Sequence, residues 1–213
     1  FQSSNLIQND YVIRALGSNI NLVRFYGDTD TKSVINELID LSKPESNVKT
    51  LFIWPEGIIP NTNQLDFKDY KSLFDNKFNK NHLLGVGINA YKIDKGKNVF
   101  YNSFSIYDHE INLINDYNKV NLVPFGEFLP IEKLLVKIGL KSLTNNYQSY
   151  TSGKKREIIE ISQENFSFKF LPLICYEIIY SGKIFNNSEF DYIVNISEDG
   201  WFGNSIGPHQ HFV

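Results

Sequence analysis

The chain has 213 residues, and its 21 basic and 24 acidic side chains give a formal net charge of −3. With 42% hydrophobic residues, this composition argues against an intrinsically disordered chain, and the absence of a basic excess argues against a nucleic-acid-binding protein. No apolar run reaches the roughly 18 residues of a membrane-spanning helix, and the single cysteine excludes an internal disulfide.

The first predicted elements alternate between strand and helix. A strand is expected at 11–16, and a helix is expected at 31–41, where apolar residues recur at helical spacing before Pro44. Residues 50–54 form a continuous apolar run, which is typical of a strand covered on both faces. The polar stretch 67–80 is weakly helical.

A β-hairpin is predicted next. Strands at 83–93 and 98–107 flank the sequence Asp-Lys-Gly-Lys at 94–97, which is typical of a tight turn. We expect a short strand at 121–124 and a small amphipathic helix at 131–140 to follow.

The last third of the chain is predicted to hold a long polar loop at 144–155 and two strands. One strand covers 166–175, where phenylalanines alternate with polar residues before a continuous apolar run, and the other covers 192–196. The pattern as a whole indicates one α/β domain with a mixed sheet.

Two short motifs favour structural roles over cofactor or metal binding. Gly85-Val-Gly87-Ile-Asn-Ala90 matches a dinucleotide-binding fingerprint, but strand-like sequence follows where that site needs a helix. We expect these glycines to let another chain segment pack closely on the sheet. His209 and His211 have no accompanying cluster of cysteines or carboxylates, so the sequence indicates no metal site.

Three other segments each place a reactive side chain just past an apolar run. They are Trp54-Pro-Glu56, Asn118-Lys119 followed by Leu122-Val-Pro-Phe-Gly-Glu127, and Cys175-Tyr176-Glu177. Taken singly, each side chain has an ordinary structural interpretation, as a loop carboxylate, a surface charge or a small buried thiol. Taken together at strand ends, they form one chemical set of a base, a cation and a thiol nucleophile.

These segments, in this order, resemble the nitrilase or carbon–nitrogen hydrolase superfamily, whose members use a Glu-Lys-Cys triad. They are most similar to one branch, the bacterial apolipoprotein N-acyltransferases. The tail from Asp199 through Trp201 to Phe212 is also similar to that branch. The chain departs from it at Glu198, where the branch usually has Asn.

The resemblance implies an α/β fold, a nitrilase-like α-β-β-α sandwich with mixed sheets, in which residues 1–213 form a carbon–nitrogen hydrolase-like catalytic domain. In the branch, membrane helices precede this domain and more sheet follows it. We therefore expect the chain to be truncated, with the membrane helices and the C-terminal part of the domain outside it, and the absence of methionine fits this expectation.

The resemblance also implies roles for individual residues. Glu56 is expected to be the general base, Lys119 the oxyanion donor and Cys175 the nucleophile, with no metal and no cofactor. A helix-like segment after Cys175 and the nearby ammonium are expected to favour the thiolate. The residues expected to support the site are Glu127, Tyr176, Glu177 and Trp201.

The implied reaction transfers an acyl group from a phospholipid to the N-terminal amine of a diacylglyceryl-modified cysteine on an apolipoprotein, through a thioester on Cys175. The implied location is the bacterial inner membrane, with the catalytic domain on the periplasmic side and membrane contact through segments outside the chain. Residues 131–155 are expected to be either a lid or an ordinary surface excursion. The alternatives are a soluble amidase or nitrilase-type hydrolase, and an inactive fragment of a split gene.

Overall fold

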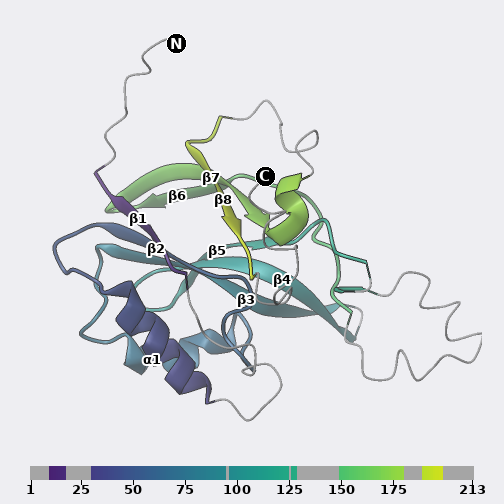
Figure 1. Ribbon diagram of the computed structural model, residues 1–213, viewed down its shortest axis with the longest axis horizontal. Coiled ribbons are helices and arrows are strands. Elements are labelled where there is room, and N and C mark those ends of the chain that lie inside the picture. The colour runs from purple at the N-terminus through teal and green to yellow at the C-terminus, as the bar shows by residue number, and fades with distance from the viewer. Residues whose placement is uncertain are drawn as a thin grey trace, which may run out of the picture.

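The structure is a computed structural model that describes residues 10–17, 30–94, 96–124, 126–128, 149–179 and 189–198 (Figure 1). A five-stranded sheet has the order β1-β2-β3-β4-β5, in which β1, β2 and β3 are parallel and β4 and β5 continue antiparallel. Its strands are β1 (Val12–Ala15), β2 (Thr50–Trp54), β3 (His82–Asp94), β4 (Lys97–Tyr107) and β5 (Leu113–Asn118).

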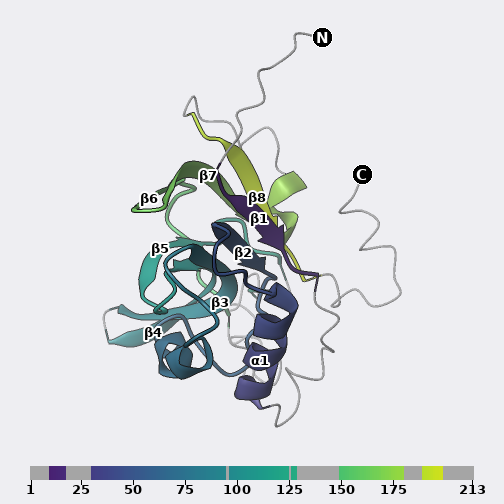
Figure 2. The same ribbon diagram turned by 90° about the vertical axis from the view of Figure 1, so that its left-hand side faces the viewer.

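A second sheet of three strands has the order β6-β7-β8, with β6 and β7 antiparallel and β7 and β8 parallel. Its strands are β6 (Ile159–Gln163), β7 (Phe166–Ile174) and β8 (Tyr192–Ile196). Figure 2 shows the two sheets as stacked layers, with α1 on the outer side of the five-stranded sheet.

The helix α1 (Thr31–Ser42) begins where Asp30 caps the chain by accepting a hydrogen bond from the Lys32 backbone N–H at 3.2 Å. It ends at Lys43, whose φ of 45° is left-handed and precedes a proline that cannot continue the helix. Its buried side chains pack on the outer face of the five-stranded sheet; they include Val34, Ile35, Leu38 and Ile39. The predicted helix is confirmed.

The apolar layer between the two sheets holds them together. The alternating phenylalanines of β7 point into this layer, where the ring of Phe170 meets that of Phe104 on β4 edge to face, with 6.0 Å between centroids. Both rings are fully buried, and burying a phenylalanine side chain stabilises a fold by about 1.5–3 kcal/mol. The β7 prediction and the predicted strands matching β1, β2, β3, β4 and β8 are confirmed.

Several predicted elements need correction. The stretch 67–80 is helical only as a 3-10 helix, η2 (Asp66–Leu73), and 121–124 is not a strand. Two strands, β5 and β6, were not predicted, because half or more of their residues are polar and few are buried. The predicted helix at 131–140 falls outside the described residues.

The predicted fold class, a mixed α/β fold with two sheets, is confirmed. The expected sandwich has two helical layers, and α1 forms one of them in the described part of the chain. None of the helices described is long and apolar enough to span a membrane.

Candidate active site

Glu56 lies in the turn directly after β2, and a glycine on the neighbouring strand lets this turn approach the sheet. A Cβ placed on Gly87 of β3 would lie 2.3 Å from the Pro55 carbonyl oxygen and 2.4 Å from the Glu56 Cα. The turn continues through Gly57, whose φ of 55° is in the left-handed region that favours glycine. Gly87 therefore has the packing role expected from the sequence, whereas Gly85 faces side chains of β4 in its own sheet. The strand β3 continues where a dinucleotide site would need a helix.

Lys119 follows β5, and its side chain is almost fully buried, with 1% of its surface exposed. The backbone is held on both sides, because its N–H donates to the Asn102 carbonyl at 2.9 Å and its carbonyl accepts from the Gly153 N–H at 2.8 Å. Its Nζ lies 3.4 Å from Glu56 Oε1 and 3.0 Å from the Glu127 carboxylate. The ammonium thus bridges two carboxylates that come from distant parts of the chain.

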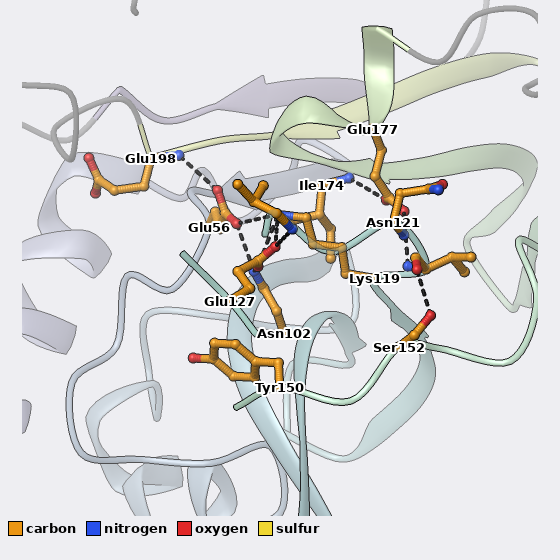
Figure 3. A network of polar contacts seen from close by, with 12 residues as sticks. Glu56, Asn102, Lys119, Asn121, Glu127, Tyr150, Ser152, Ile174, Glu177 and Glu198 are labelled. Carbon is orange, nitrogen blue, oxygen red and sulfur yellow. Dashed lines mark hydrogen bonds and ion pairs between the residues drawn. The ribbon is translucent and has the colours of Figure 1, made fainter. Parts of the chain in front are cut away.

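Asn102 on β4, which no sequence motif marks, completes this cluster (Figure 3). Its Nδ2 donates to Glu56 Oε1 at 2.7 Å and to Glu127 Oε1 at 2.8 Å. The other oxygen of Glu127 accepts from the Val123 backbone N–H at 2.9 Å. The one feature that distinguishes Asn102 is a buried amide within a strand, where asparagine is uncommon.

The electrostatics of the cluster suit proton transfer. Burial raises the pKa of the Glu56 carboxyl, with the Glu127 charge adding to this, while Lys119 and Asn102 oppose it. Burial disfavours the charge on Lys119, but the two carboxylates outweigh burial and raise the pKa of its ammonium. A carboxylate whose pKa moves up towards neutrality beside a firmly charged ammonium is a suitable general base.

Cys175 stands at the end of β7 and begins the 3-10 helix η4 (Cys175–Ile179). Its φ of 54° is left-handed, an uncommon conformation for a residue with a side chain and one that recurs at functional sites. Burial and the charge of Glu56 raise the pKa of the thiol to about 12, against the opposing effect of Lys119. The expectation of a stabilised thiolate is therefore wrong, because burial outweighs the ammonium and the helix is only a short 3-10 turn.

Glu177 is fully buried and joins the segment carrying Cys175 to the segment carrying Lys119 (Figure 3). Its carboxylate accepts hydrogen bonds from the Tyr117 hydroxyl at 2.9 Å and from the Ile174 backbone N–H at 3.0 Å. Further donors are the backbone N–H groups of Val120 and Asn121 and the guanidinium of Arg156. Glu177 thus holds in place the backbone that precedes Cys175 and the backbone that follows Lys119.

Glu56, Lys119 and Cys175 line one cavity of about 450 Å³. Tyr176 and Glu198 also line it, and the Glu198 backbone N–H donates to Glu56 Oε2 at 3.2 Å. In Figure 3 the Glu198 carboxylate points away from Glu56.

Other sequence-predicted candidates fall outside this description. Trp201, His209 and His211 lie outside the described residues. Within the part of the chain that the structure describes, no three histidine, cysteine or acidic side chains are grouped to hold a metal ion.

Comparison with known families matches residues 45–213 to the family model described as carbon–nitrogen hydrolase. The chain is 34% identical over 165 residues to the apolipoprotein N-acyltransferase of Rhodopseudomonas palustris, a match that covers 76% of the chain and 30% of that relative. It is 32% identical over 212 residues to the apolipoprotein N-acyltransferase of Wigglesworthia glossinidia brevipalpis, which covers 94% of the chain and 40% of the relative. The chain thus spans less than half the length of these curated relatives.

Among solved structures, the fold is similar to that of a carbon–nitrogen hydrolase from Helicobacter pylori G27. The TM-score is 0.54 at 16% sequence identity, and the match covers 94% of this chain and 64% of the other.

Proposed function

The chain belongs to the carbon–nitrogen hydrolase family, and on that premise we propose that it is the catalytic part of an apolipoprotein N-acyltransferase. The proposed reaction moves an acyl group from a phospholipid to the α-amine of a diacylglyceryl-modified N-terminal cysteine. The observation that carries the proposal is the meeting of Glu56, Lys119 and Cys175 in one cavity. The sequence identity to curated enzymes of this name supports the choice of branch.

In the proposed first step, Glu56 takes the proton of the Cys175 thiol as the sulfur attacks the ester carbonyl carbon of the phospholipid. The carbon–sulfur bond forms, and the bond to the glycerol oxygen then breaks. The leaving oxygen receives the proton from Glu56, so the products are a thioester and a lysophospholipid. Base assistance is needed because burial keeps the thiol protonated.

Lys119 and the Tyr176 backbone N–H are the proposed donors to the oxyanion of the tetrahedral intermediate. The N–H of Tyr176 interacts with the Cys175 thiol, and Lys119 interacts electrostatically with the same sulfur. Removing one oxyanion donor typically lowers kcat by about 10²–10³-fold.

In the proposed second step, the amine of the apolipoprotein attacks the thioester carbonyl and Glu56 accepts a proton from the amine nitrogen. The carbon–sulfur bond breaks, and that proton returns to the sulfur, which regenerates the thiol and releases an amide. Glu127 and Asn102 hold Glu56 and Lys119 in place through both steps. The proposed location is the bacterial inner membrane, with this domain on its periplasmic side.

The proposal is tested by mass spectrometry of Cys175 after incubation with phospholipid micelles. We expect an acyl adduct on Cys175 in the wild-type protein, none in Glu56→Gln, and a normal adduct in Glu157→Gln, which alters an exposed carboxylate. Absence of any adduct in the folded wild-type protein would refute the transferase assignment, and adduct formation at the wild-type rate in Glu56→Gln would remove Glu56 from the role of base.

A soluble amidase or nitrilase-type hydrolase, with water as the acyl acceptor, is the second candidate, because the family model that the chain matches is described as carbon–nitrogen hydrolase. Rapid hydrolysis of small amides together with no reaction towards lipid donors would select this candidate. Absence of both activities in folded protein would select the inactive fragment.

A further inference from the structure

Tyr150 lies on the wall of the catalytic cavity, although no sequence motif marks it. It is half-buried and lines the cavity together with Cys175 and Glu127. Burial, with the charges of Glu127 and Glu56 adding to it, raises the pKa of its hydroxyl to about 12. The phenol therefore keeps its proton at neutral pH and remains a hydrogen-bond donor.

The hydroxyl proton of Tyr150 is already engaged in a hydrogen bond within the protein. The Tyr150 hydroxyl donates to Asn89 Oδ1 at 2.8 Å. Asn89 lies on β3 directly opposite Asn102 on β4, and its carbonyl accepts from the Gln64 N–H at 2.7 Å, so the sheet holds it in place. A hydroxyl bound to Asn89 is unsuited to donate to a reacting carbonyl, so what Tyr150 offers to the cavity is its ring.

The backbone of Tyr150 is fixed as firmly as its hydroxyl. Its N–H donates to the Glu127 carbonyl at 2.8 Å, and the next residue, Thr151, donates to the Phe100 carbonyl at 2.6 Å. Two residues further on, a Cβ on Gly153 would lie 2.1 Å from the Asn118 carbonyl oxygen, so the segment is in direct contact with the backbone beside Lys119. A ring held at both ends is a rigid surface.

The ring of Tyr150 is one of the two large apolar groups among the described residues that line the cavity. Among the described residues of the lining, Val123 and Gly126 are small, and the other tyrosine, Tyr176, adjoins Cys175 in sequence. An acyl group on Cys175 needs apolar surface beside its carbonyl, and a rigid apolar wall discriminates between acyl groups by size.

We propose that Tyr150 is a specificity-determining residue whose ring contacts the acyl group on Cys175 and limits its bulk near the carbonyl, and that Asn89 positions this ring. The identity of the ligand as an acyl group rests on the proposed function. The proposal that the ring limits the size of groups attached to Cys175 in the shared cavity does not, and it is tested separately.

The first experiment measures the rate at which alkyl methanethiosulfonates modify Cys175, comparing the methyl reagent with the benzyl reagent. In each case the sulfur forms a disulfide with the alkylthio group and methanesulfinate leaves. We expect Tyr150→Ala to raise the benzyl-to-methyl rate ratio by about tenfold, because the ring no longer limits bulk beside the sulfur. Asn89→Ala keeps the ring but frees it, so a smaller rise is expected.

Tyr101→Ala is the matched control, because it removes a tyrosine from a separate cavity, where Lys92 lies over its ring. Its rate ratio should equal that of the wild type. An unchanged ratio in both Tyr150→Ala and Asn89→Ala would overturn the proposal, as would an equal rise in Tyr101→Ala.

The second experiment repeats the comparison with phospholipids that carry straight or α-branched acyl chains, and it follows the adduct on Cys175 by mass spectrometry. We expect the ratio of branched-chain to straight-chain adduct on Cys175 to be about tenfold higher in Tyr150→Ala than in the wild type. Adducts with an unchanged preference would overturn the assignment of the acyl group to this wall. A changed methanethiosulfonate ratio without any lipid adduct would instead refute the proposed function and leave the wall in place.

Discussion

Replacing Gly87 by alanine tests how closely the base must be placed. The new Cβ would lie 2.3 Å from the Pro55 carbonyl oxygen and 2.4 Å from the Glu56 Cα, and both contacts are with backbone, which cannot rotate away. The turn must therefore move outwards by about 0.7 Å to reach even the 3.0 Å limit of real Cβ contacts. Glu56 would move with it, away from Asn102.

Two effects are expected from this shift. Overpacking lowers the free energy of unfolding by about 1–3 kcal/mol, which in a protein of this size lowers Tm by about 2–4 °C per kcal/mol. Misplacing a catalytic group by about 1 Å lowers the rate by about 10²-fold. The assay is thioester formation at Cys175, expressed per folded molecule and compared with Tm.

Gly85→Ala is the matched control on the same strand. Its Cβ would meet the ring of Phe104 at 2.8 Å and the side chain of Ile106 at 3.1 Å, and these are the outer ends of side chains that can shift without moving the backbone, so it disturbs local packing and leaves the Glu56 turn and the spacing of the sheets unchanged. We expect a comparable loss of Tm with little loss of rate. Equal rate losses at equal Tm, or a wild-type rate in Gly87→Ala, would refute the reasoning.

Three further predictions concern buried groups. Because only the thiolate reacts and the pKa of the Cys175 thiol is about 12, alkylation by iodoacetamide should accelerate about tenfold per pH unit up to about pH 10; a plateau below about pH 9 would contradict this. Glu177→Gln should lower the free energy of unfolding by about 3–5 kcal/mol, as measured in urea, because it breaks a buried charge network, whereas the exposed Glu157→Gln should change it by less than about 1 kcal/mol. Burial lowers the pKa of His82, so the unfolded state takes up its proton first as the pH falls and stability should drop below about pH 6.5; an equal drop in His82→Gln would refute this cause.

The features that could be predicted best from the sequence are those that depend on contiguous residues. Continuous apolar runs located β2 and most of β7, and the residues at their ends, Glu56 and Cys175, were found because a reactive side chain followed directly. The edge strand β5 (Leu113–Asn118) was missed because its sequence, Leu-Ile-Asn-Asp-Tyr-Asn, is half polar and only one of its residues is buried.

Features that depend on pairing between distant segments were not predictable in this way. Asn102 reaches Glu56 because β4 pairs with β3 in one register, and a shift by a single residue would turn its side chain to the other face. Tyr150 lies in the cavity because Gly153 lets its segment contact the backbone near Lys119. The raised pKa of Cys175 likewise follows from burial, which the local sequence does not reveal.

The two sheets contribute different members of the proposed triad. Glu56 and Lys119 follow strands of the five-stranded sheet, whereas Cys175 follows a strand of the three-stranded sheet, and the phenylalanine layer lies between them. In the proposed mechanism, the spacing of that layer sets the distance across which the proton travels from sulfur to carboxylate. We therefore expect a substitution of Phe104 or Phe170 that changes this spacing to alter the rate constant and the melting temperature together, so a thermostabilised variant must be screened for both.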